Sequence, residues 1–163
     1  MKDISEPFET LTDDPGPPGQ KRGPLLYQLP PSLTFDVRTL DHALRTMLVA
    51  DKGKIIIEAR HRSWSSQEAV DLRETQKIDH VFADPAPVWP AETFSEPPRC
   101  VRLHGNPESY YYAYGDDEIR FFSKLVAPEG WCVSDNTASS AAIENALTMK
   151  CMPAGHPVRK TPG

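Results

Sequence analysis

The stretch KIIIE (Lys54–Glu58) is the clearest strand signal in the chain. Three consecutive β-branched isoleucines favour extended backbone, and an unbroken apolar run is typical of a strand covered on both faces, as in a parallel sheet. Helical patterns lie before and after this stretch. Strands that are separated by helices imply parallel neighbours joined by right-handed crossovers.

Short apolar runs on both sides of this strand predict four more strands, at residues 25–29, 80–84, 99–104 and 131–134. Apolar residues at helical spacing predict helices over 34–49 with Asp36 as N-cap, from Ser65 with Glu68 at the capping-box position, from Asp116, and up to Met149 with Ser139 or Ser140 as N-cap. The proline-rich residues 85–98 are expected to form a long loop anchored by Trp89 and Phe94.

This alternation fits an open doubly wound sheet or a β/α barrel. Polar residues follow the carboxyl ends of several different strands, which is typical of a barrel's active face: Glu58, Asp84, Arg102, His104, Asp135 and Asn136. The chain has 163 residues, fewer than the roughly 250 of a complete barrel. We therefore expect an α/β fold of the TIM type that is partial, with about five of eight parallel strands in one open, curved sheet.

Prolines divide the chain, because 17 of its 163 residues are proline and they gather in three clusters. Residues 1–18 are expected to be a proline-rich, partly disordered segment. Residues 19–152 would form the barrel domain. The small, polar residues 153–163 would be a disordered tail.

Composition excludes several classes of partner. The formal net charge is −5 and there is no long basic run, so a nucleic-acid-binding face is not indicated. No apolar stretch approaches the roughly 18 residues of a membrane-spanning helix, and the start lacks the apolar core of a signal peptide. A cytoplasmic location is expected. The three cysteines form no C-x-x-C pair and are interpreted as small buried apolar residues.

Five segments resemble, in order, segments of the YecE-like family (domain of unknown function 72): GPLLYQLPP at 23–31, EARHRSW at 58–64, AD at 83–84, VRLHG at 101–105, and SDN at 134–136 followed by AIENAL at 142–147. Arg62 stands where the family usually has proline, and Ser134 and Asp135 replace an aromatic residue and an asparagine. No counterpart of the family's first three strands is found. The resemblance, over about residues 19–152, therefore implies the C-terminal part of a TIM-type barrel of unknown function.

Strand alternation can turn Gln28, Glu58, Asp84, Arg102 and His104 into the barrel mouth, with Asp135 and Asn136 on its rim. Glu58, Asp84 and His104 are the candidate catalytic acids and bases. The candidate residues that bind an anionic substrate are Gln28, Arg60, His61, Arg102, Asp135 and Asn136.

Two alternatives for these side chains stay open. Glu58, Asp84, His104 and Asp135 are metal-ligand types, but no close ligand spacing supports a metal, so none is predicted and the cofactor stays unassigned. In the second alternative, Glu58 and Arg102 form an internal salt bridge that holds the barrel mouth and do not bind a ligand.

For function, we expect an anionic-ligand or enzyme-like cleft at the carboxyl ends of the strands, with an unknown reaction. Fold analogy favours hydrolase or lyase chemistry on an anionic small molecule or a nucleic-acid-derived substrate. The alternative is a truncated, non-catalytic remnant or interaction module that self-associates through open barrel edges.

Overall fold

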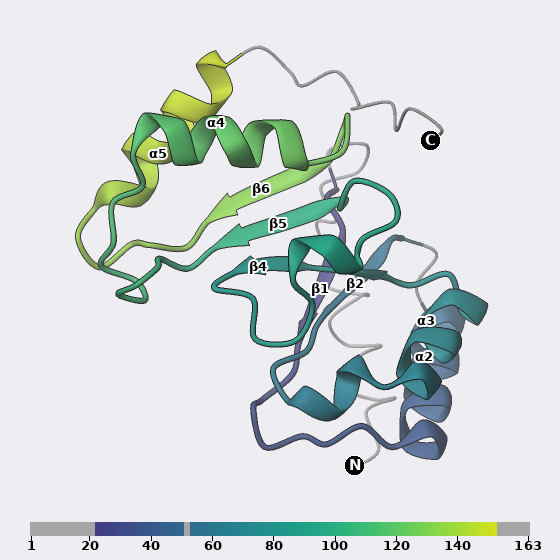
Figure 1. The fold of residues 1–163 in the computed structure, drawn as a ribbon. Coiled ribbons are helices and arrows are strands. Elements are labelled where there is room, and N and C mark those ends of the chain that lie inside the picture. The colour runs from purple at the N-terminus through teal and green to yellow at the C-terminus, as the bar shows by residue number, and fades with distance from the viewer. Residues whose placement is uncertain (1–21, 51–52, 153–163) are drawn as a thin grey trace, which may run out of the picture. The chain divides into compact units, whose positions relative to one another are not determined.

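The computed structural model describes residues 22–50 and 53–152 (Figure 1). The predictions for residues 1–18 and for the tail 153–163 lie outside these ranges. The chain divides into two compact units, Met1–Ile78 and Asp79–Gly163, which are described separately below. The single domain expected over 19–152 stays a prediction.

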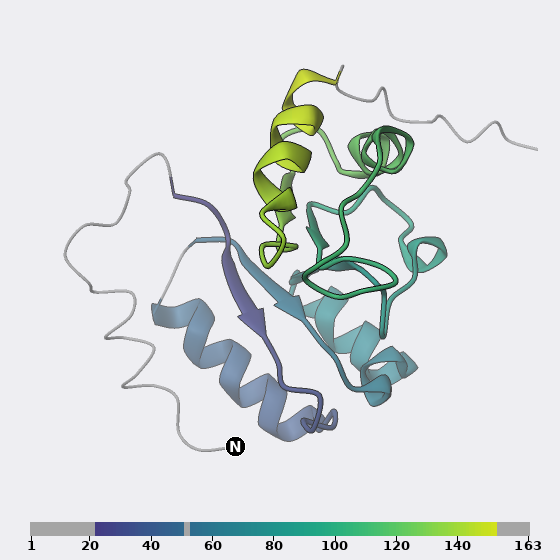
Figure 2. The same cartoon turned by 90° about the vertical axis from the view of Figure 1, so that its left-hand side faces the viewer.

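Unit 1 contains two parallel strands and two α-helices. Its elements are β1 (Leu25–Gln28), α2 (Val37–Ala50), β2 (Ile55–Glu58), the 3-10 turn η2 (Arg62–Ser65) and α3 (Gln67–Thr75). The strands β1 and β2 run side by side in Figure 2, and their register places Gln28 opposite Glu58. All four residues of β2 are buried, which confirms that the isoleucine run is covered on both faces.

The segment that follows β2 fixes the approach to α2. The indole Nε1 of Trp64 donates to the carbonyl of Leu33 at 2.9 Å, and the ring of Trp64 meets Phe35 edge to face. The backbone N–H of Phe35 donates to Ser63 Oγ at 2.7 Å. The helix α2 then begins directly after Asp36, as expected.

The N-cap of α3 differs from the prediction. Ser65 ends the 3-10 turn, and its hydroxyl donates to the carbonyl of Arg62 at 2.8 Å. Ser66 caps the helix instead, because its Oγ accepts from the backbone N–H of Ala69. The shift by one residue removes Glu68 from the capping-box position.

Unit 2 contains a parallel sheet with α-helices on one face. Its elements are β3 (Asp79–His80), β4 (Phe82–Asp84), the 3-10 turn η3 (Ala91–Thr93), β5 (Cys100–Leu103), α4 (Asp116–Leu125), β6 (Trp131–Ser134) and α5 (Ala141–Cys151). The strands β4, β5 and β6 pair in parallel and in sequential order. The helix α5 packs on β6 and against α4 (Figure 1). The core joins Phe82, Val101 and Leu103 of the sheet to Tyr114, Ile119 and Phe122.

The strand pairing corrects the expected sheet. Parallel pairing in sequential order is confirmed within each unit, so the fold is α/β. The strands lie in two sheets rather than one, and residues 22–50 and 53–152 form no closed barrel. The reason lies at Val81, where the strand expected over 80–84 is interrupted and divides into β3 and β4.

The long proline-rich loop is anchored through His80. Phe94 stacks on the His80 ring with centroids 4.1 Å apart, and Trp89 meets the same ring edge to face at 4.8 Å. Trp89 and Phe94 are thus the anchors that the sequence predicted, with η3 as a short turn inside the loop.

The helix α4 begins at the predicted acidic residues. The carboxylate of Glu118 turns back and accepts the backbone N–H of Gly115 at 2.8 Å, which caps the helix. The same carboxylate accepts the hydroxyl of Tyr112 at 3.0 Å. This hydrogen bond raises the pKa of Tyr112 above its usual range.

The turn after β5 requires glycine. Gly105 has φ +101°, and a Cβ at this position would lie 2.7 Å from the carbonyl oxygen of Glu108. At Gly115 the φ is −78° and an added Cβ would meet only the Glu118 carboxylate at 3.7 Å. Gly105 and Gly115 therefore provide a matched pair of positions at which the effect of alanine on stability can be compared.

We expect Gly105→Ala to lower the free energy of unfolding by about 2 kcal/mol or more, because it adds both a positive-φ penalty and a backbone clash. Gly115→Ala should cost less than about 1 kcal/mol, since only an N-cap preference is lost. Urea unfolding followed by circular dichroism measures both. Equal losses in the two variants would contradict this account of the turn.

The three cysteines differ in exposure. Cys100 is buried as expected, Cys132 is partly buried, and Cys151 is exposed on α5, which corrects the prediction for that residue. Burial raises the pKa of the Cys132 thiol to about 12.

Thiol-reactive dyes should therefore label Cys151 first at pH 8. Cys132 should react slowly, because a pKa near 12 leaves about one thiolate in ten thousand at that pH. Mass spectrometry of the labelled protein measures the order, and Cys151→Ser should abolish the fast phase. A fast phase that survives this substitution would show that Cys100 or Cys132 is accessible.

Candidate functional site

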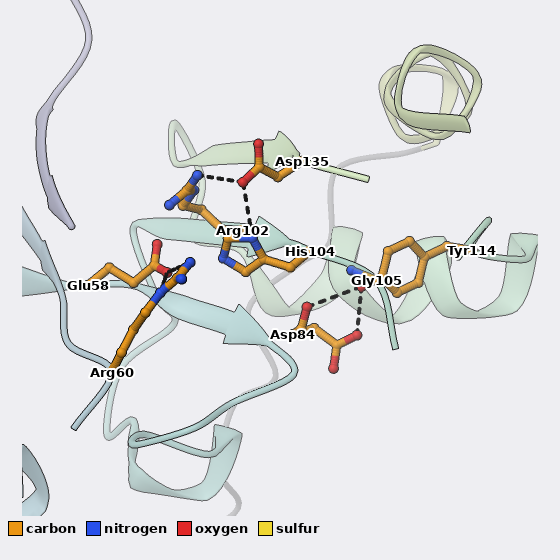
Figure 3. A network of polar contacts seen from close by, with 8 residues as sticks. All are labelled: Glu58, Arg60, Asp84, Arg102, His104, Gly105, Tyr114 and Asp135. Carbon is orange, nitrogen blue, oxygen red and sulfur yellow. Dashed lines mark hydrogen bonds and ion pairs between the residues drawn. The ribbon is translucent and has the colours of Figure 1, made fainter. Parts of the chain in front are cut away.

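One carboxylate in unit 2 contacts a guanidinium and an imidazole. Asp135 Oδ2 accepts a hydrogen bond from an Arg102 guanidinium nitrogen at 2.6 Å, and it lies 3.0 Å from Nδ1 of His104 (Figure 3). Arg102 and His104 are buried, whereas Asp135 is about one third exposed. We call these three residues the Asp135 cluster.

The strand register explains why the Asp135 cluster forms. Leu103 pairs with Ser134, so the next residues, His104 and Asp135, leave neighbouring parallel strands at the same level. The backbone N–H of Asp135 also donates to the carbonyl of Leu103 at 2.8 Å. Arg102 and His104 are two residues apart and share one face of the sheet. The intervening Leu103 faces the core instead.

The Asp135 cluster combines a guanidinium, an imidazole and a carboxylate at the carboxyl ends of neighbouring strands. The contact of His104 Nδ1 with the carboxylate oxygen at 3.0 Å is an ion pair when the ring is protonated. Of these side chains, the guanidinium of Arg102 is positive and the carboxylate of Asp135 is negative.

The side chain of Asp84 lies on the other face of the sheet from the one that the sequence predicted. It pairs with Leu103 rather than with Arg102, so its side chain follows the core face of the sheet. Its carboxylate accepts the hydroxyl of Tyr114 at 2.8 Å (Figure 3). Burial, and next this hydrogen bond, raise the pKa of Tyr114 well above its usual range. The alternation phase assumed for Asp84 is wrong, and its catalytic role stays a prediction.

Asn136 is fully buried rather than placed on a rim. Its Nδ2 donates to the carbonyl of Tyr112 and to Oδ1 of Asn145, both at 2.8 Å. Asn145 in turn donates to the carbonyl of Tyr114 and accepts its N–H. Sequence reasoning missed Asn145 and Tyr114. A signal existed for Asn145, because an amide inside an otherwise apolar helix pattern usually has a buried partner.

The remaining candidates lie in unit 1. Gln28 and Glu58 are opposite each other at the carboxyl ends of β1 and β2. Two guanidinium nitrogens of Arg60 lie 3.3 Å from Oε1 of the buried Glu58 (Figure 3). His61 caps the η2 turn, since its Nδ1 accepts the N–H of Ser63. These contacts place Glu58 and Arg60 together, and the expected Glu58–Arg102 salt bridge stays a prediction.

The residues that the structure describes contain no group of three or more His, Cys, Asp or Glu side chains arranged to hold a metal ion. Among those residues no helix is long and apolar enough to cross a membrane.

Comparisons with known proteins agree on one family. The chain resembles a DUF72 family protein from Thermotoga maritima with 24% identity and a TM-score of 0.71, over 91% of this chain and 65% of that one. It resembles a DUF72 family protein from Enterococcus faecalis with 20% identity and a TM-score of 0.70, over 91% of this chain and 66% of that one. The chain thus spans about two thirds of the length of these structures. No curated protein matches it.

A family model described as "Protein of unknown function DUF72" matches residues 1–162. YecE-like is another name for this family, so the resemblance seen in the sequence is confirmed. The match includes the first 18 residues, and the restriction to the family's C-terminal part is not confirmed. The chain belongs to the DUF72 family.

Proposed function

We propose that the Asp135 cluster binds an anionic small molecule and that His104 acts there as a general acid and base. The observation that carries the proposal is the shared oxygen. The oxygen Oδ2 of Asp135 contacts both a guanidinium nitrogen of Arg102 and Nδ1 of His104, which brings the two side chains together. A guanidinium and an imidazole that meet at one point are donors with which proteins hold anionic groups.

The position of the cluster supports the same proposal. Arg102, His104 and Asp135 lie at the carboxyl ends of neighbouring parallel strands, where α/β folds carry their ligand sites. Asp135 would hold the imidazole in one orientation, as a carboxylate does for a catalytic histidine. Hydrolase or lyase chemistry on the anion is the reaction class that suits one oriented acid–base group and one guanidinium.

We also propose that the fold is a partial TIM-type barrel. Parallel strands in sequential order, with polar residues at their carboxyl ends, support a partial TIM-type barrel. A cytoplasmic location is likewise a proposal. Within unit 1, Gln28, Glu58, Arg60 and His61 are proposed as ligand-binding residues on the same reasoning from strand ends.

Two substitutions in the cluster should change anion affinity in opposite directions. His104→Gln removes the imidazole and should weaken the binding of inorganic phosphate about threefold or more. Asp135→Asn removes the competing negative charge and should strengthen phosphate binding by about threefold to tenfold. Isothermal titration calorimetry at low ionic strength measures both, with sulfate as a second probe.

The matched control is His42→Gln, because His42 is exposed on α2, outside the cluster. This variant should bind phosphate as the unaltered chain does. A purely structural role for the cluster predicts that both cluster substitutions lower the melting temperature and abolish binding alike. That outcome, or the absence of any heat with both anions, would refute the proposed function.

A second candidate function rests on exposed apolar side chains. Ile143 and Leu147 lie one turn apart on α5 and are 71% and 58% exposed, and Trp131 and Val133 of β6 are also exposed. The strand β6 is at the edge of the β4–β5–β6 sheet. Exposed apolar residues and an open strand edge each favour association. The alternative is therefore an interaction module that self-associates.

If self-association is the function, the chain should sediment as a dimer or larger species at micromolar concentration. Ile143→Lys with Leu147→Lys should then shift it to the monomer, since two charges would enter the apolar contact. Glu144→Lys, on the same helix beside Ile143, controls for added charge alone. A monomer at all concentrations in analytical ultracentrifugation would exclude this candidate.

A further inference from the structure

Tyr110 has a backbone conformation that side chains seldom adopt. Its φ is +70°, in the left-handed region where glycine and asparagine are favoured. Two backbone hydrogen bonds hold it there. Its N–H donates to the carbonyl of His104 at 2.5 Å, and its carbonyl accepts the N–H of Ala138 at 3.0 Å. The residue is thus fixed between the turn after β5 and the segment after β6.

This backbone places the phenol ring against the Asp135 cluster. The ring centroids of Tyr110 and His104 are 6.1 Å apart and the rings are nearly perpendicular, at 87°. Tyr110 is nevertheless 43% exposed. Its ring therefore contacts the imidazole and also meets solvent.

Packing within the fold does not account for a tyrosine at position 110. A turn with this φ would be less strained with glycine, and a ring that stays nearly half exposed contributes little burial in return. Strained residues of this kind gather at ligand sites, where the fixed position of the side chain serves binding. Tyrosine is well suited to such a contact because it offers a flat, rigid surface with few rotatable bonds.

We propose that Tyr110 stacks on the ring of the substrate, which is an anion that carries a flat ring. The inference rests on the proposed function, because the anionic group would bind at the Asp135 cluster. A ring attached to that group directly or by a short linker would then lie against the Tyr110 phenol. Aryl phosphates and nucleoside monophosphates share this chemistry.

The test compares three probes by calorimetry: inorganic phosphate, phenyl phosphate and cyclohexyl phosphate. The last two carry the same charge and differ in the flatness of the ring. We expect the unaltered chain to bind phenyl phosphate about tenfold more tightly than cyclohexyl phosphate, since stacking requires a flat ring. Tyr110→Leu should reduce this preference to about twofold or less.

Two further variants separate stacking from folding. Tyr110→Gly relieves the positive φ while it removes the ring, so the melting temperature should be unchanged or higher and the preference should still be lost. Tyr111→Leu alters the neighbouring tyrosine, which is more exposed than Tyr110, and should keep the preference.

The outcomes separate the two proposals. If inorganic phosphate binds and the phenyl preference is absent, or survives in both Tyr110 variants, the stacking role is wrong and the proposed function stands. If none of the three probes binds, both are refuted. A preference that depends on Tyr110 and not on Tyr111 supports the inference.

Discussion

The hydroxyl of Tyr114 joins the ends of two strands, and the geometry around His104 depends on this junction. The hydroxyl donates to the Asp84 carboxylate at the end of β4 and accepts the N–H of Gly105, just after β5, both at 2.8 Å. His104 precedes Gly105 and donates its own N–H to the carbonyl of Asp84 at 2.9 Å. The imidazole is therefore carried on backbone that is fixed on both sides, which limits where the His104 ring can lie.

Buried amides extend this junction to the last helix. Asn145 of α5 holds the backbone of Tyr114, and Asn136 bridges Asn145 and the carbonyl of Tyr112. Asn136 directly follows Asp135, so the same network limits where the shared carboxylate can lie. The helix α5 thus buries an amide inside the fold and leaves Ile143 and Leu147 outside. A fully connected polar network specifies one arrangement more sharply than apolar packing does.

The sequence predicted the strands well because each is a short apolar run with a clear end. The bounds of β6 agree at both ends, and β2 and β5 agree within one residue. It also predicted that Arg102, His104 and Asp135 gather, since carboxyl ends of parallel strands meet at one edge. It could not predict on which face of the sheet the Asp84 side chain lies, because that depends on the register between β4 and β5. It also missed the Asn145 network, which joins residues about 30 positions apart.

The two raised phenol pKa values imply that the folded chain loses stability in alkaline solution. Tyr112 and Tyr114 both donate to carboxylates, and both keep their proton in the folded chain to a higher pH than the ordinary value of about 10. Below that pH the phenols are protonated whether the chain is folded or not, and their contribution to stability is complete. Above it the unfolded chain releases these protons while the folded chain retains them, so the free energy of unfolding falls as the solution becomes more alkaline. The turn that carries His104 is thus secured by a phenol, Tyr114, that keeps its proton throughout the neutral range.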